Sequence, residues 1–219
     1  MEKKKEPPKI RVVVRKRPLF GKEIQRNDRD ILTVVSDNSL VVQELKEKVD
    51  LTKYIEEHSF TFDNVFEQDK DNAALYDECV LPLVAETFKG AKTTCFAYGQ
   101  TGSGKTYTMM GTSDGSVSGM YTLASYDIVD LLKAYEGLDL FISFYEIYCG
   151  KLYDLLNKRT HVQCREDSKQ RVNIIGLTEK QVFEVEDIMD TIHEGLKCRT
   201  SGTTGANEES SRSHAILTY

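Results

Sequence analysis

Gly99-Gln100-Thr101-Gly102-Ser103-Gly104-Lys105-Thr106 is the stretch of this sequence that decides the fold. It fits the pattern G-x-x-x-x-G-K-[ST], in which glycines let the backbone curl so that successive N–H groups point at phosphate oxygens. Lys105 would bring a positive charge to the β- and γ-phosphates, and the Thr106 hydroxyl would ligate Mg²⁺. The motif therefore predicts a site for ATP or ADP with Mg²⁺.

The residues on both sides of this loop favour that interpretation over a glycine-rich turn that matches by chance. The apolar run at residues 93–98 precedes the loop, and we expect it to form a strand at the centre of a sheet covered on both faces. The run at residues 105–110 follows the loop and is compatible with a helix, whose N-terminus would face the same phosphates. A strand, a glycine-rich turn and a helix in this order are the context that the motif requires.

Hydrophobic patterns elsewhere predict strands that alternate with helices. Strands are expected at residues 10–14, 32–35, 40–45, 138–148, 172–175 and 214–219, and around Phe60 and Phe62. Helices are expected at residues 71–88, 120–135 and 185–196. This order predicts an α/β fold with a mixed, mainly parallel central sheet and helices on both faces.

Local signals add detail to two of these elements. Asp37 and Asn38 are expected to form the turn of a hairpin between the second and third strands. Pro82 should kink or split the first helix, because proline lacks the N–H group that a helix interior needs. Asp71 or Asn72 is the expected cap of that helix, and Gly90 its expected end.

Composition limits the classes of protein that this chain can represent. Of 219 residues, 40% are hydrophobic and 29% are charged, which fits one folded domain rather than a disordered chain. No run of about 18 apolar residues is present, so we expect no membrane span. The formal net charge of −6 disfavours a nucleic-acid partner. Residues 1–9 are charged and are expected to form a flexible leader, without the features of a signal peptide.

Cysteines and histidines give no sign of a metal site. The five cysteines have no metal-ligand spacing, and Cys79 and Cys95 lie in apolar patterns that predict buried free thiols in a reducing, intracellular setting. The histidines also lack such spacing; they are His58, His161, His193 and His214. No nucleophile–base pair indicates covalent catalysis.

A second polar cluster lies near the end of the sequence. It reads Asn207-Glu208-Glu209-Ser210-Ser211-Arg212-Ser213-His214. Small hydroxyls beside an arginine suit a loop that senses a γ-phosphate, because serine hydroxyls can bond the phosphate or its Mg²⁺. A solvated serine-rich loop would have the same composition, so only the combination with the phosphate motif favours the functional interpretation.

With both clusters considered together, the chain resembles the kinesin motor domain. Further motifs carry the resemblance in the family's order: Arg15-Lys16-Arg17-Pro18-Leu19, Phe96-Ala97-Tyr98, Tyr107-Thr108-Met109, Phe144-Tyr145-Glu146-Ile147-Tyr148 and Asp154-Leu155-Leu156. The resemblance implies that Arg15, Arg17 and Pro18 form the adenine-side wall of the nucleotide site. It also implies that Tyr107 lies near the base.

The same resemblance assigns the second cluster to switch I. Asn207, Ser210 and Ser211 would surround the γ-phosphate, Mg²⁺ and the attacking water, with Ser211 and Thr106 as the metal ligands. Arg212 resembles the arginine that pairs with a switch II glutamate. That glutamate belongs to a D-x-x-G-x-E motif that would follow Tyr219. Residues 10–219 are therefore expected to be the N-terminal part of a motor domain, without switch II and much of the microtubule-binding surface.

Two segments indicate a particular group within this family. Lys48-Val49-Asp50-Leu51-Thr52-Lys53-Tyr54 and Cys198-Arg199-Thr200-Ser201-Gly202 resemble the internal-motor kinesins, the kinesin-13 group. The resemblance implies that Lys48, Val49 and Asp50 form an extended finger that reaches tubulin at a curved protofilament. Composition alone would describe Lys46 to Asp50 as a charged hairpin tip.

The sequence thus predicts a microtubule-stimulated ATPase that depolymerises microtubule ends, with tubulin as its partner and the cytoplasmic microtubule cytoskeleton, spindle included, as its location. One alternative is a plus-end-directed transport kinesin. Others are a non-catalytic, nucleotide-gated tubulin-binding module and, with less support, an unrelated P-loop NTPase. The sequence indicates no oligomeric state, cargo or direction of movement. The loops at residues 111–119 and 134–138 look shorter than the resemblance implies.

Overall fold

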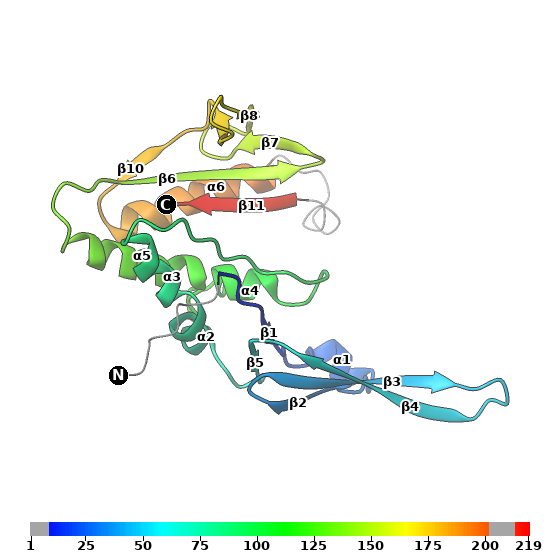
Figure 1. The fold of residues 1–219 in the computed structure, drawn as a ribbon. Coiled ribbons are helices and arrows are strands. Elements are labelled where there is room, and N and C mark those ends of the chain that lie inside the picture. The colour runs from blue at the N-terminus through cyan, green and yellow to red at the C-terminus, as the bar shows by residue number, and fades with distance from the viewer. Residues whose placement is uncertain (1–8, 202–212) are drawn as a thin grey trace. The chain divides into compact units, whose positions relative to one another are not determined.

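The computed structural model describes residues 9–201 and 213–219, and it divides the chain into two compact units, Met1–Leu75 and Tyr76–Tyr219 (Figure 1). The boundary between the units falls inside helix α2 (Asn72–Cys79). The leader expected at residues 1–9 lies, apart from Lys9, outside the described residues.

The first unit contains two small sheets. A parallel pair is formed by β1 (Val13–Arg15) and β5 (Asn64–Phe66), and an antiparallel sheet by β2 (Leu32–Ser36), β3 (Ser39–Glu47) and β4 (Lys53–Thr61). A short helix, α1 (Gly21–Gln25), follows β1. The expected hairpin is confirmed, because Ser36 pairs with Ser39 across the turn at Asp37 and Asn38. Leu40, Val65 and Phe66 are buried and supply the core of this unit.

The strand expected at residues 10–14 is shifted toward the C-terminus. Ile10 and Val12 are exposed, and pairing with β5 begins only at Val13. The three residues of β5 limit the pairing to three residues of β1. Our prediction of a buried strand from residue 10 is therefore wrong for its first half.

The hairpin of β3 and β4 extends beyond the rest of its sheet (Figure 1). These two strands pair from Ser39↔Thr61 to Glu47↔Lys53. Pairing of β2 with β3 stops at Leu32↔Val42. The far half of the hairpin is therefore a two-stranded ribbon, which depends on cross-strand side-chain pairs for its stability.

The second unit is built around a six-stranded sheet of order β10-β6-β7-β8-β9, with β11 also paired to β6 (Figure 1). Its strands are β6 (Leu140–Tyr148), β7 (Lys151–Asp154), β8 (Thr160–Glu166), β9 (Val172–Ile175), β10 (Lys180–Val182) and β11 (Ser213–Thr218). Among the described strands, β6 pairs with the most neighbours, which are β7, β10 and β11.

Two long helices, α5 (Met120–Leu132) and α6 (Val185–Ser201), complete the core of this unit. On α6, Ile188, Ile192 and Gly195 recur at helical spacing on one buried face. That face packs with the buried Leu140 and Ile142 of β6. The shorter helices are α3 (Leu81–Thr87) and α4 (Lys105–Met110). None of the helices in the described ranges is both long and apolar enough to cross a membrane.

Proline splits the first predicted helix, as expected. Helix α2 ends at Cys79 and α3 begins at Leu81, with Pro82 in its first turn, where the missing N–H costs nothing. The Asp71 side chain accepts a 2.8 Å hydrogen bond from the Ala74 N–H and caps α2. Gly90, with φ of +89°, lies just past the end of α3.

The strand predicted at residues 93–98 is absent from the structure, so that prediction is wrong. Phe96 is 77% exposed and Tyr98 95% exposed. Cys95 is exposed as well and Cys79 only half-buried, which corrects the prediction of two buried thiols. A strand needs a neighbour for its N–H and C=O groups, and no strand in the described ranges pairs with this segment.

The predicted strand directions also need correction. Among the described pairings only β1 with β5 is parallel, and every pairing in the six-stranded sheet is antiparallel. Parallel and antiparallel pairings both occur in the described part of the chain, but in separate sheets, and antiparallel pairing predominates.

We predict that Gly195→Ala destabilises the protein even though alanine favours helices by about 1 kcal/mol. A Cβ at this position would overlap Cδ1 of Phe144 on β6, so α6 would have to move away from the sheet. The free energy of unfolding should fall by about 1–3 kcal/mol, as for other overpacked cores, when measured by urea denaturation. His193→Ala, on the exposed side of the same helix, is the control. Equal stability of Gly195→Ala and the parent would contradict the tight packing.

Candidate functional site

The loop at residues 99–104 leads directly into α4, which begins at Lys105. Gly102 and Gly104 have φ values of +80° and +96°, a left-handed conformation that side chains with a Cβ rarely adopt. The Ser103 N–H donates a 3.1 Å hydrogen bond to the Gln100 carbonyl and closes the turn. The curled backbone that the sequence motif predicts is therefore present.

Gly99 and Ser103 pack against each other inside this turn. A Cβ at Gly99 would overlap the Ser103 Oγ atom, so only glycine fits there without a shift. The Ser103 Oγ atom is buried and makes no hydrogen bond in the structure. An unsatisfied buried hydroxyl is costly, and a bound phosphate oxygen is a partner that would satisfy it.

Lys105 places its ammonium group within the same turn. Its Nζ atom donates hydrogen bonds of 2.7 Å to the Gly99 carbonyl and 2.9 Å to the Gln100 carbonyl. A phosphate is a stronger acceptor for an ammonium group than a neutral carbonyl, because both partners are then charged. The residues present thus fit a phosphate group. Thr106 and Tyr107, which follow on α4, are exposed beside the turn.

The predicted adenine-side residues lie in the first unit, where both arginines hold neighbouring segments. Arg15 donates to the Asn72 side chain at 2.5 Å and to the Lys70 carbonyl at 2.9 Å. Arg17 binds both carboxylate oxygens of Glu23, at 2.8 and 2.7 Å. The phosphate loop belongs to the second unit, and the adenine-side role of Arg15, Arg17 and Pro18 stays a prediction.

The pair of Arg17 and Glu23 carries the largest charge effect in this unit. Hydrogen bonds from Arg17 and from the Phe20 N–H lower the pKa of Glu23 to about 2. The pKa of Arg17 is raised, chiefly by the hydrogen bond to Glu23. The Arg17 guanidinium also lies 4.3 Å from the centre of the Phe20 ring. These contacts fix the chain between β1 and α1.

The predicted switch I residues Asn207, Ser210, Ser211 and Arg212 lie outside the described residues, and their roles stay predictions. The segment that they occupy is flanked by α6, which ends at Ser201, and by β11, which begins at Ser213.

A buried ion cluster connects these flanking elements, and the sequence alone did not predict it. Glu146 on β6 is 1% exposed and binds Arg159 at 3.0 Å and Arg199 at 3.3 Å. Arg199 also donates a 2.7 Å hydrogen bond to the Ser213 hydroxyl. The available signal was a single carboxylate within an otherwise uncharged strand at residues 140–148.

The predicted tubulin-contacting residues lie at the tip of the β3–β4 hairpin. The tip is closed by hydrogen bonds from the Lys48 N–H to the Thr52 carbonyl and from the Leu51 N–H to the Lys48 carbonyl. Asp50 accepts a 3.0 Å hydrogen bond from the Thr52 N–H, which helps to lower the pKa of Asp50. Val49 is fully exposed at the end of the ribbon.

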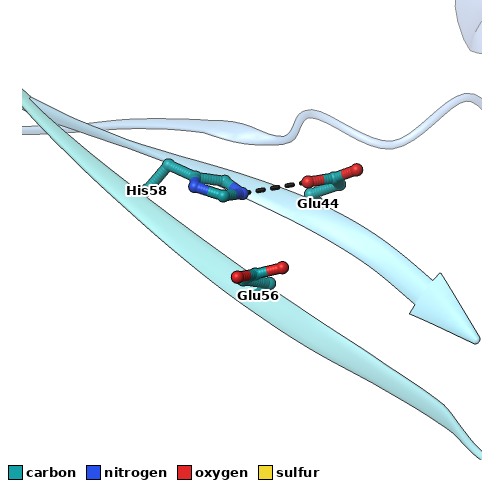
Figure 2. Close-up of side chains that lie close together, drawn as sticks. All are labelled: Glu44, Glu56 and His58. Atoms are coloured by element: carbon teal, nitrogen blue, oxygen red, sulfur yellow. Dashed lines mark hydrogen bonds and ion pairs between the residues drawn. The ribbon is translucent and has the colours of Figure 1, made fainter. Parts of the chain in front are cut away.

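A cluster of possible metal ligands lies along the same ribbon (Figure 2). One ligand atom each of Glu44, Glu56 and His58 lies within 4.8 Å of the others, and His58 Nε2 is 2.9 Å from Glu44. The register brings them together, because Glu44 pairs with Glu56 across the ribbon. Lys46 already forms ion pairs with both carboxylates, so we assign no metal to this cluster.

Comparisons with known proteins point to one family. Residues 15–219 match the family described as Kinesin motor domain. The human kinesin-like protein KIF24 is 50% identical over 212 residues, which are 95% of this chain and 15% of the human protein. The Arabidopsis thaliana kinesin-like protein KIN-13B is 51% identical over 212 residues, 95% of this chain and 30% of the plant protein.

A solved structure agrees with these matches. The structure of a fast kinesin superposes with a TM-score of 0.83 at 32% identity, covering 95% of this chain and 58% of that chain. This similarity confirms the kinesin-type α/β fold that the sequence predicted. The chain spans well under a third of the length of KIF24 and less than two thirds of the solved kinesin.

We predict that Glu23→Gln lowers stability at neutral pH and has less effect in acid. The folded-state pKa of about 2 lies below the unfolded value of about 4.3. The stabilising effect of the carboxylate is therefore complete above pH 4.3 and declines as the pH falls toward 2. Urea midpoints of parent and variant, measured between pH 7 and pH 3, should converge as the pH decreases. Glu136→Gln removes an exposed carboxylate as the control. A difference that stays constant over this range would argue against the Arg17–Glu23 pair.

Proposed function

This chain belongs to the kinesin motor-domain family, and we propose that it binds and hydrolyses ATP and uses the cycle to remove tubulin from microtubule ends. The observation that carries the nucleotide part is the turn at residues 99–104, in which the Lys105 ammonium is held by two backbone carbonyls. The unpaired Ser103 hydroxyl in the same turn supports it.

Each predicted residue has a role in this proposal. Lys105 and the backbone N–H groups of the loop hold the β- and γ-phosphates. Thr106 and Ser211 would hold Mg²⁺, which would neutralise charge on the phosphates. Asn207, Ser210 and Ser211 orient the attacking water, and Arg212 pairs with a carboxylate of switch II. Arg15, Arg17 and Pro18 would form the adenine-side wall, and Tyr107 would lie near the base.

The hairpin of β3 and β4 supports a depolymerising activity. Its tip presents Val49 between Lys48 and Asp50 at the end of a ribbon that no third strand covers in the described part of the chain. A projecting tip of this kind can contact a surface that differs between straight and bent tubulin. Tighter binding to the bent form shifts the equilibrium toward bending and detachment. We place this activity on microtubules in the cytoplasm.

Transport along the microtubule lattice is the main alternative. The solved fast kinesin is described in terms of its ATPase mechanism and its interactions with microtubules, which suits that alternative too. The chain is 51% identical to the plant relative named KIN-13B but 32% identical to the solved fast kinesin. This difference, together with the exposed hairpin tip, favours depolymerisation. Processive movement of single molecules would support transport, whereas shrinking filaments would support depolymerisation. An absence of turnover with tubulin would leave a non-catalytic tubulin-binding module.

We predict that Lys105→Ala nearly abolishes ATP turnover in the full-length protein. Loss of the ammonium removes a charged hydrogen-bond donor to phosphate, so affinity for a fluorescent ADP analogue should also fall by about tenfold or more. Lys89→Ala removes an exposed lysine paired with Glu86 and is the matched control. Turnover like that of the parent in Lys105→Ala would refute the assignment of the phosphate site.

We predict that replacing Lys48, Val49 and Asp50 together by alanine spares basal ATP turnover and removes microtubule-end disassembly. The tip makes its backbone hydrogen bonds with its own residues, so the ribbon should still form. Light microscopy of stabilised microtubules measures the shortening rate. Replacing the exposed Lys22 and Gln25 of α1 by alanine is the control in the same unit. Undiminished shortening of microtubules by the triple variant would contradict the proposed role of Lys48, Val49 and Asp50 in disassembly.

A further inference from the structure

Glu146 is a carboxylate enclosed by the sheet of the second unit. It lies on β6, is 1% exposed, and uses both of its oxygens for ion pairs with arginine. Oε2 accepts from the Arg159 Nε atom and Oε1 from the Arg199 Nε atom. Because a carboxylate that loses its partner in such a place is strongly disfavoured, the positions of both guanidinium groups are tied to Glu146.

The two arginines connect Glu146 to different parts of the fold. Arg159 directly precedes β8, and its guanidinium lies 4.8 Å from the Tyr153 ring centre and 5.3 Å from that of Tyr148. These contacts of Arg159 are all with residues of the sheet. Arg199 comes instead from the last turns of α6, and its second contact is the hydroxyl of Ser213, the first residue of β11.

Arg199 thus joins three elements at one point: the end of α6, the second half of β6 and the start of β11. Ser213 is also held by the sheet, where it pairs with Tyr148. The chain between these anchored ends contains the predicted switch I residues at 207–212. The contact between Arg199 and Ser213 therefore holds together the two described ends from which that chain continues.

The chemistry of the cluster fits orientation better than stability. A buried ion pair often contributes no more to stability than apolar side chains of the same size. A carboxylate does, however, fix the plane and direction of each guanidinium that it binds, and lysine cannot reproduce this geometry. Glu146 therefore orients Arg199 so that its NH2 group meets the Ser213 hydroxyl.

We propose that Glu146 and Arg199 are positioning residues for ATP hydrolysis, acting through Ser213, which directly follows the predicted switch I residues in the sequence. The inference rests on the proposed ATPase function and adds to it residues that act through the Ser213 hydroxyl. Because Arg159 shares the same carboxylate but does not contact Ser213, it provides an internal control for the structural part of the cluster.

The test compares three variants of the full-length protein for kcat, KM for ATP and thermal unfolding. Ser213→Ala removes only the acceptor at the start of β11 and should lower kcat about tenfold with little change in KM or unfolding temperature. Arg199→Lys keeps the positive charge but lacks the planar guanidinium that donates to Glu146 and Ser213 together. The value of kcat should therefore fall by at least as much as in Ser213→Ala. Arg159→Ala should lower the unfolding temperature by several degrees and leave kcat within about twofold of the parent.

Hydrogen exchange gives a second measurement that does not need turnover. Ser213→Ala should increase exchange at the end of α6 and the start of β11, whereas Arg159→Ala should increase it near β7 and β8. The inference is overturned if Ser213→Ala retains parental kcat, or if kcat falls in Arg159→Ala as it does in Arg199→Lys. Absence of ATP turnover in the parent itself would instead refute the proposed function, and the inference with it.

Discussion

Close packing of α6 on β6 is the constraint on which the second unit depends. Gly195 allows the helix to approach Phe144, and the buried Ile188 and Ile192 complete the contact. Strand β6 in turn pairs with β7, β10 and β11, so its position sets theirs. The helix and β11 flank the segment that carries the predicted switch I residues. The geometry at both ends of that segment therefore follows from one helix–strand contact.

The phosphate loop, by contrast, is held by local interactions. The hydrogen bonds that shape it run from Lys105 to the carbonyls of Gly99 and Gln100, and from Ser103 to Gln100. The segment before the loop forms no strand in the described structure, yet the turn keeps its curled backbone. The described hydrogen bonds that shape the turn therefore lie within residues 99–105.

This difference explains how much could be predicted from the sequence. Local signals succeeded: the Asp71 cap, the split at Pro82, the turn at Asp37 and Asn38, and the periodic face of α6. Predictions that depend on distant partners failed, as with the strand at residues 93–98 and the direction of strand pairing. The Glu146 cluster was missed for the same reason, since its arginines lie 13 and 53 residues away along the chain.

The ribbon of β3 and β4 depends both on local sequence signals and on pairing between residues that are separated in the sequence. Composition indicates a charged hairpin tip at Lys46 to Asp50, but only the register shows that Glu44, Lys46, Glu56 and His58 share one face. Cross-strand ion pairs on that face stabilise a ribbon that buries little apolar surface. Leu45 and Ile55, paired on the other face, can therefore stay exposed together with Val49 at the tip. The charged face thus supplies rigidity to the ribbon, and the exposed apolar residues lie on its other face and at the tip, where the proposed contact with tubulin would be made.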